Sequence, residues 1–195
     1  MTNNKTRFIT QISALSAIAA VLMLFEFPLW FAPGFYKMDL SDLPALIGGF
    51  ALGPVAGVLI ELVKNLINLL INGTATACVG EFSNFVIGCS FVLPASLVYK
   101  YHKTKKFAIV GMIVGTVSVS VVGSAMNAFV LIPAYVKLLN LPLENIIAMG
   151  NAVNSSITSL GTLVMFAVVP FNLLKGIIVS LITALIYKKI RILLK

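Results

Sequence analysis

The positions of the basic residues constrain this chain more than any other feature of its sequence. Ten of its fourteen Lys and Arg residues lie in three clusters, at residues 5–7, 100–106 and 188–195, and the sequence between the clusters is almost entirely apolar. Cytoplasmic loops of membrane proteins are enriched in Lys and Arg. We therefore expect all three clusters on the cytoplasmic side, which requires an even number of membrane crossings between one cluster and the next.

The composition favours a membrane protein and argues against a nucleic-acid-binding protein. Hydrophobic residues make up 59% of the chain and charged residues only 10%, whereas soluble domains carry about 25% charged residues. The net charge of +8 would suit a nucleic acid, but the basic residues flank apolar segments and form no continuous basic stripe. The first apolar run is also too long for a signal peptide and lacks a small-residue cleavage site.

Six apolar segments account for the required crossings. Crossing a hydrocarbon core of ~30 Å takes about 20 helical residues, and Gly53-Pro54 divides one long apolar stretch into a short and a longer helix. The predicted spans are 8–26, 42–53, 55–72, 82–100, 107–139 and 164–188, and the predicted outer loops are 27–41, 73–81 and 140–163. The predicted fold is thus an all-α integral membrane protein, a single membrane domain over residues 1–195 with six transmembrane helices and both termini cytoplasmic.

The sequence suggests neither a nucleotide site nor a metal site. There is no G-x-x-x-x-G-K-[ST] loop, and we interpret the single histidine, His102, as a solvated loop residue. Cys78 and Cys89 are interpreted as buried thiols. In the first outer loop, Trp30 and Tyr36 suit the headgroup level.

Ionisable and amide side chains inside the third span call for an explanation, because such groups are costly in lipid. Glu61, Lys64, Asn65, Asn68 and Asn72 fall on one helical face, and Glu61 and Lys64 are spaced to form an ion pair. The face is either a polar seam that holds the bundle together or a ligand-contacting surface. Asn68 and Asn72, nearer the outer end, are the better ligand candidates.

Other spans carry polar groups in their outer halves, and together they suggest a pocket open to the outside. Asn172 and Lys175 follow Pro170 in the last span, although Lys175 could instead extend its ammonium to the interface. The remaining candidates are Ser120, Ser124, Asn127 and Tyr135 in the fifth span, and Glu81 and Asn84 at the start of the fourth. Carboxamides with aromatic neighbours suit a flat, neutral ligand, because an Asn amide presents a donor and an acceptor to an imide edge.

The first span offers a surface for close helix packing. Ser13 and Ala17 are four residues apart, as are Ser16 and Ala20, and small residues at this spacing let another helix approach closely. The approaching helix could belong to a partner protein or to this bundle.

Three stretches of sequence resemble a known family. They are residues 37–54, KMDLSDLPALIGGFALGP, which lead on to Glu61-x-x-Lys64-Asn65; residues 80–85, GEFSNF; and residues 170–176, PFNLLKG. These stretches are similar to the riboflavin-specific S components of energy-coupling factor (ECF) vitamin transporters, and the resemblance covers nearly the whole chain.

The resemblance implies a riboflavin-binding transport subunit of a prokaryotic plasma membrane, not an enzyme, with riboflavin as the transported ligand and no cofactor. In this family the loop after the first helix closes over the ligand. The S component docks on a transmembrane coupling subunit that bears two ATP-binding subunits. An Ala-x-x-x-Ala motif in the first helix meets the coupling subunit, and here Ser13 or Ser16 replaces its first Ala, with Ala17 or Ala20 as the second.

The resemblance also implies which residues touch the ligand. Asn172 and Lys175 match a polar pair that contacts the flavin ring, Asn127 takes the matching place in the fifth span, and Asp39 and Leu40 supply backbone contacts. From their positions in the sequence we add four further candidates: Asn68, Glu81, Asn84 and Tyr135. Three alternatives remain: an S component for a different vitamin, a membrane enzyme that uses Glu61 and Lys64, and a purely structural membrane scaffold.

Overall fold

A computed structural model describes the backbone of residues 2–194 and the side chains of residues 4–186, so the side chains of the last basic cluster lie outside the described residues. Within this part of the chain, five helical segments are long and apolar enough to cross a membrane. They are Asn4–Leu24, Pro54–Asn72, Val79–Tyr101, Lys105–Leu138 and Leu160–Ile186. The chain is therefore all-helical apart from short connections.

The elements follow one another along the chain with few long loops. The α-helices are α1 (Thr2–Leu24), α2 (Asp42–Leu52), α3 (Pro54–Asn72), α4 (Val79–Tyr101), α5 (Lys105–Met126), α6 (Ile132–Leu138), α7 (Leu143–Val153), α8 (Leu160–Leu163) and α9 (Val169–Leu194). Two π-helical segments are η1 (Asn127–Leu131) and η2 (Val164–Val168), and two short strands are β1 (Phe27–Pro28) and β2 (Lys37–Met38).

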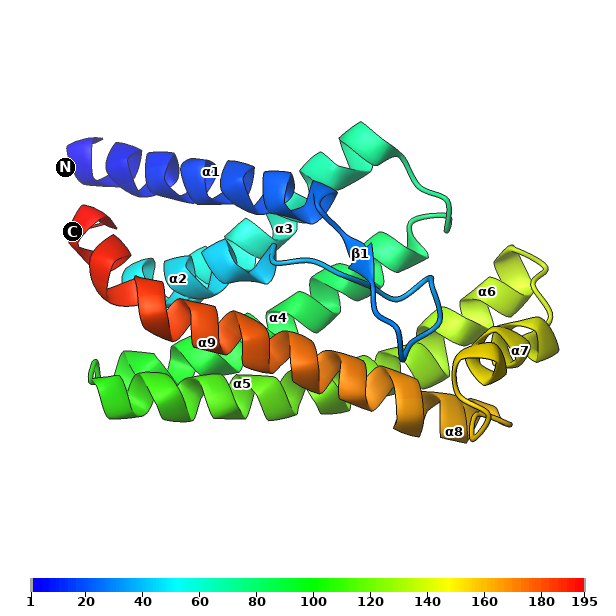
Figure 1. Ribbon diagram of the computed structural model, residues 1–195. Coiled ribbons are helices and arrows are strands. Elements are labelled where there is room, and N and C mark those ends of the chain that lie inside the picture. Colours follow the sequence, from blue (N-terminus) through cyan, green and yellow to red (C-terminus); the bar gives the residue numbers. More distant parts are fainter. Residues whose placement is uncertain (1, 195) are drawn as a thin grey trace.

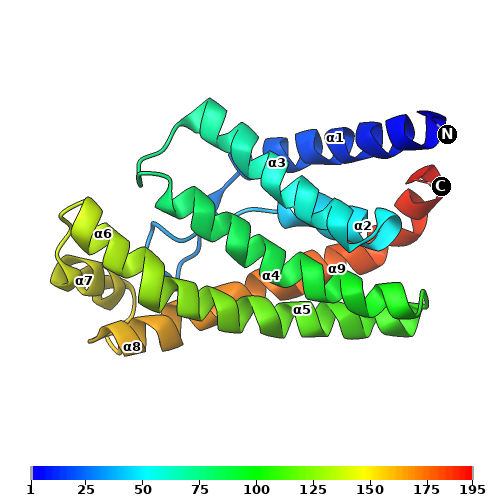
Figure 2. The ribbon, with the colours of Figure 1, turned by 180° about the vertical axis from the view of Figure 1, so that it is seen from behind.

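The long helices lie roughly side by side and give the molecule two distinct ends. The two chain ends, the α2–α3 turn and the α4–α5 turn lie at one end, and the β1–β2 loop, α6, α7 and α8 lie towards the other (Figure 1). Seen from behind, α3, α4 and α5 cover the back of the bundle (Figure 2). The first end holds the start of α1, which carries Lys5 and Arg7, and the α4–α5 turn, which carries the lysines of residues 100–106. We call it the basic end.

Helix α2 is short and lies inside the bundle. Its end is set by Gly53, whose φ of 111° favours glycine, and by Pro54 at the start of α3, as the sequence predicts. Eleven helical residues span only about 16 Å at 1.5 Å each, half of a ~30 Å hydrocarbon core. Residues Asp42–Phe50 are all buried, and α2 packs against α1, α3, α4 and α9.

The loop that precedes α2 folds into the bundle. Its strands pair Phe27 with Met38 and Pro28 with Lys37. Trp30 is largely exposed, whereas Tyr36 is buried within the protein. The loop places Leu29, Ala32, Tyr36 and Met38 in a core with Ile132, Ile146, Leu163 and Phe171. Removing this apolar surface from water stabilises the buried position.

Two long helices are interrupted by π-helical turns that the sequence does not reveal. Helix α5 continues through η1 into α6, and α8 continues through η2 into α9. The two π-helical segments contact one another. Single π-helical turns inside α-helices occur frequently at functional sites. Of the predicted ligand side chains, Asn127 is the first residue of η1, and Asn172 lies in the first turn of α9, just after η2.

The two cysteines differ from the predicted pair of buried thiols. Cys78 is exposed and Cys89 is only partly buried. The prediction fails for Cys78 because α4 begins at Val79, which leaves Cys78 in the preceding loop with a φ of 66°. His102 is exposed, as predicted, and its ring lies 4.5 Å from that of Phe107.

Candidate functional site

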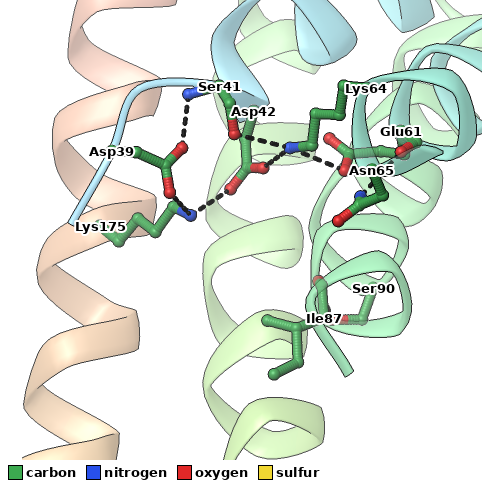
Figure 3. A network of polar contacts seen from close by, with 9 residues as sticks. All are labelled: Asp39, Ser41, Asp42, Glu61, Lys64, Asn65, Ile87, Ser90 and Lys175. Carbon is green, nitrogen blue, oxygen red and sulfur yellow. Dashed lines mark hydrogen bonds and ion pairs between the residues drawn. The ribbon is translucent and has the colours of Figure 1, made fainter. Parts of the chain in front are cut away.

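Buried charged side chains and one serine surround the first residues of α2. They contact one another, and we call them the ion network (Figure 3). It joins the loop before α2, α2 itself, α3 and α9. Its members are Asp39, Ser41, Asp42, Glu61, Lys64 and Lys175.

Lys64 is the centre of one half of the ion network. Its Nζ lies 2.8 Å from Glu61 Oε2, donates to Ser41 Oγ at 2.9 Å, and also donates to Asp42 Oδ1. Glu61 and Lys64 have no exposed surface. The predicted Glu61–Lys64 ion pair is thus confirmed, and it extends to the start of α2.

Lys175 is the centre of the other half. Its Nζ lies 3.2 Å from Asp39 Oδ2 and 3.1 Å from Asp42 Oδ2, while Asp39 Oδ1 accepts from the Ser41 N–H at 2.7 Å. The alternative in which Lys175 extends to the interface is therefore wrong, because two buried carboxylates hold its ammonium inside the bundle.

The ion network holds three carboxylates against two ammonium groups, and Asp42 bridges both lysines. The Glu61 carboxylate packs directly against Gly88 of α4. A Cβ on residue 88 would lie 2.3 Å from Glu61 Oε2, so a larger residue at this position would clash with the carboxylate. Buried ion pairs contribute little net stability, but removal of one partner strands a charge in a low dielectric. The network therefore fixes the position of the loop and of α2 relative to α3 and α9.

Two buried amides lie beside the π-helical turns. Asn127, the first residue of η1, donates to Gly123 O at 2.8 Å. Asn172 lies just after η2 and donates to Val168 O at 3.0 Å. A Cβ on Gly123 would lie 2.7 Å from Asn172 Nδ2, so α5 and α9 approach closely here and bring the two amides to the same place.

The loop occupies this place with Tyr36. The Tyr36 hydroxyl donates to Asn127 Oδ1 at 2.8 Å, and its ring lies 5.7 Å from that of Phe171. Burial, and to a smaller degree the neighbouring Tyr135, raises the pKa of Tyr36 above its ordinary value. Tyr36 is consequently a neutral phenol and a hydrogen-bond donor at physiological pH.

Asp39, Asn127, Asn172 and Lys175 are therefore brought together around the loop, and with Tyr36 we call them the loop-covered site. Leu40 is partly buried and packs against both apolar cores. Tyr135 packs against the apolar core that contains Tyr36.

The other predicted ligand residues have different partners. Asn72 donates to Asn68 at 2.8 Å near the end of α3. Glu81 accepts from Thr74 and Thr76, each at 3.1 Å, and so ties down the loop before α4. Among the described side chains, no hydrogen bond or ion pair links Asn68, Glu81 or the half-buried Asn84 to the loop-covered site.

Sequence reasoning did not single out Tyr36, Ser41 and Asp42 as parts of one site. The sequence does contain an indication that Asp42 pairs with a lysine, namely the positions of the charged residues in and beside the apolar segments. Lys64 and Lys175 are isolated lysines in apolar segments, and Asp39 and Asp42 are acids just before and at the start of the second predicted span. Since intramembrane charges usually pair with one another, these four residues were candidates to meet.

The small residues of α1 divide between its two faces. Ser16 and Ala20 are buried, and the Ser16 Oγ has no hydrogen-bond partner within the described residues. Ser13 and Ala17 are exposed. Ser16 and Ala20 therefore pack inside this bundle, and of these four residues only Ser13 and Ala17 face outwards.

The chain is similar to known proteins over its whole length. A model of the family described as "ECF transporter, substrate-specific component" matches residues 7–187. "Riboflavin transporter RibU" of Staphylococcus aureus (strain TCH60) is 40% identical over 195 residues, which cover 100% of this chain and 95% of the relative. "Riboflavin transporter FmnP" of Bacillus subtilis (strain 168) is 34% identical over 96% of this chain and 93% of its own length.

A solved structure shows the same fold. It is described as "Structure and mechanism of the S component of a bacterial ECF transporter", with a TM-score of 0.76 and 36% sequence identity over 98% of this chain and 99% of that one. With the family match over residues 7–187, the conclusion is direct: this chain belongs to the family of substrate-specific components of ECF transporters.

Proposed function

We propose that this chain is the membrane subunit of an ECF transporter that binds riboflavin and mediates its uptake. The observation that carries the proposal is the loop-covered site, in which Asn127, Asn172 and Lys175 meet. The site lies in a chain that is 40% identical, end to end, to a protein named as a riboflavin transporter.

The chemistry of the site suits the polar edge of a flat ring. Asn172 uses one N–H for Val168 O, which leaves its carbonyl oxygen and second N–H for an imide edge. Lys175 can donate to a ring carbonyl or nitrogen. Phe171 and Tyr36 supply aromatic surface beside these groups.

Ligand binding at this place requires the loop to exchange partners. Tyr36 now satisfies Asn127, and Asp39 now pairs with Lys175. A ligand that hydrogen-bonds to Asn127 and Lys175 replaces these two contacts, and the loop then covers the ligand from the outer side. The replaced contacts keep the buried polar groups partnered when the ligand is absent, which avoids the cost of leaving them unsatisfied.

The proposed arrangement in the membrane has six crossings, with both termini on the cytoplasmic side of a prokaryotic plasma membrane. The second crossing consists of α2 together with the loop before it, because α2 alone is too short. The partners are a transmembrane coupling subunit and two ATP-binding subunits. The exposed pair Ser13 and Ala17 offers the surface on α1 where the coupling subunit approaches.

A catalytic role for Glu61 and Lys64 is wrong, since the chain belongs to a family of transport subunits and not of enzymes. Both side chains are fully buried and are held by the ion network. The purely structural scaffold is wrong for the same reason. An S component for a different vitamin is the remaining alternative, and it is an outcome of the experiment below.

The experiment is a fluorescence titration of riboflavin with the purified chain in detergent. Riboflavin emission should be quenched to saturation at one ligand per chain, and a tenfold excess of thiamine or biotin should not displace it. ATP should remain unhydrolysed in the same preparation. A folded, ligand-free preparation that leaves riboflavin emission unchanged, or that releases riboflavin to another vitamin, would contradict the substrate assignment.

A further inference from the structure

Two adjoining hollows lie at the basic end of the bundle, away from the loop-covered site. The larger, of about 470 Å³, lies between the start of α5, the end of α4 and α9. The smaller, of about 250 Å³, lies between the α2–α3 turn and the end of α4. Phe50, Tyr99 and Lys103 line both. The larger hollow is within the size range of small-molecule sites.

The charged side chains among the described residues that line these hollows are cationic. Lys103 borders both, Lys100 borders the smaller and Lys105 borders the larger. No acidic residue is among the described residues that line either hollow. A ligand held here therefore meets an uncompensated positive charge, which favours an anion.

The walls of the larger hollow are mostly apolar and continue into an exposed apolar face of α5. Ile109, Met112 and Leu185 line it. Ile109, Ile113 and Val117 follow at four-residue spacing, and more than half of each of these side chains is exposed. An apolar stripe thus runs from the lysines towards the middle of α5, along one helix face.

We infer that this end of the protein binds an anionic phospholipid. The phosphate lies among Lys100, Lys103 and Lys105, and an acyl chain enters the larger hollow beside Ile109 and Met112. Basic pockets between transmembrane helices on the cytoplasmic side commonly bind anionic headgroups. The apolar walls distinguish this site from one for a free phosphate, which would leave them without a partner.

The test uses the full chain, purified in detergent and freed of lipid, with native mass spectrometry as the readout. Phosphatidylglycerol and phosphatidylcholine with identical acyl chains are titrated separately, and glycerol 3-phosphate supplies the headgroup without chains. We expect one phosphatidylglycerol to bind at least fivefold more tightly than phosphatidylcholine. Glycerol 3-phosphate should not compete at the lipid concentrations that saturate the site.

Matched variants locate the site. Lys103→Gln should weaken phosphatidylglycerol binding about fivefold, the effect of one lysine near an anionic headgroup. Lys106→Gln removes the same charge from the same region of the chain, but Lys106 lines neither hollow. This variant should bind phosphatidylglycerol with an affinity within twofold of the wild type. Ala108→Trp fills the larger hollow and should abolish tight binding.

The thermal unfolding midpoint of each variant, together with riboflavin titration at the other end, reports whether the variant is folded. If Ala108→Trp does not fold, the pair Lys103→Gln and Lys106→Gln decides the question. Equal affinity for the two lipids, equal effects of the two Gln variants, or displacement of the lipid by glycerol 3-phosphate would each overturn the proposal.

Discussion

Asp42 is the residue on which the buried charges depend. One of its oxygens accepts from Lys64 and the other lies 3.1 Å from Lys175, so a single side chain at the start of α2 ties α3 to α9. An acidic residue in the first turn of a helix also interacts favourably with the helix dipole. Asp42 thus compensates two buried lysines and anchors a short helix.

The ion network predicts a large effect from the loss of one lysine. Lys64→Met leaves Glu61 fully buried without its partner, and breaking a buried ion pair in this way costs about 3–5 kcal/mol. We expect the variant to unfold at a markedly lower denaturant concentration in detergent. Adding Glu61→Gln to Lys64→Met should recover part of the loss, because the stranded charge is gone.

Lys137→Met is the control for this comparison, since Lys137 is exposed and should change stability by less than about 0.5 kcal/mol. The account of the ion network would be wrong if Lys64→Met unfolded together with the wild type, or if the added Glu61→Gln lowered stability further.

Sequence reasoning could find one part of this network and not the other. Glu61 and Lys64 are three residues apart, so helical periodicity alone predicts their pairing. Asp39 and Lys175 are separated by 136 residues, and no local pattern connects them. Their pairing depends on the loop entering the bundle, which is a consequence of the packing of Leu29, Tyr36 and Met38.

Among the helices, α1 has one face that packs inside this bundle and one face that is exposed. Ser16 and Ala20 lie on the first, Ser13 and Ala17 on the second. The sequence alone treats the two pairs as equivalent, because both have small residues at the same spacing. Only the position of α1 against α2 and α3 separates them.

A large side chain should therefore have different effects on the two faces: loss of uptake on the exposed face and loss of stability on the buried face. Ala17→Trp leaves the bundle intact and should keep riboflavin affinity unchanged while uptake is lost in cells that supply the other transporter subunits. Ser16→Trp places the ring in a buried position with no exposed surface, so it should lower stability and expression instead. Normal uptake by a well-expressed Ala17→Trp variant would show that this face does not dock.

The helices themselves follow from the sequence, but their irregularities do not. Apolar runs predict the long helices, and Gly53-Pro54 predicts where α2 ends. The two π-helical turns have no signature in the sequence, since a π-helical turn differs from an α-helical one by a single extra residue. These turns nevertheless lie beside Asn127 and Asn172, so the geometry of the candidate site could not be derived from periodicity.

At the scale of the whole molecule, the charges separate the two ends of the bundle. The basic end holds the start of α1 and the α4–α5 turn, which carry the first two basic clusters. The β1–β2 loop and the α3–α4 loop, which contains the exposed Cys78, lie away from it (Figure 1). This separation predicts the orientation of the protein in the membrane.

Cys78 is a natural probe of that orientation. A membrane-impermeant maleimide should label Cys78 in intact cells, and Cys78→Ser should abolish that labelling. Thr104→Cys in the Cys78→Ser background should react with the maleimide only after the membrane is permeabilised, because residue 104 lies in the basic turn between α4 and α5. Labelling of residue 104 in intact cells would reverse the proposed topology.

Calorimetric titration of a matched set of variants tests whether riboflavin binds at the loop-covered site. Asn172→Ala and Lys175→Ala each remove a hydrogen bond to a buried ligand group, which costs about 1–3 kcal/mol, or roughly ten- to a hundredfold in affinity. Lys175→Ala also leaves Asp39 without its cation and Asp42 with Lys64 alone, so the stability of this variant must be measured alongside its affinity. Asn65→Ala should affect stability more than affinity.

Asn72→Ala is the control, because it removes an amide of the same kind at the exposed end of α3. The account predicts that Asn172→Ala and Lys175→Ala weaken riboflavin binding ten- to a hundredfold while Asn72→Ala binds as tightly as the wild type. Unchanged affinity in both Asn172→Ala and Lys175→Ala would contradict it, and would place the flavin ring elsewhere in the molecule.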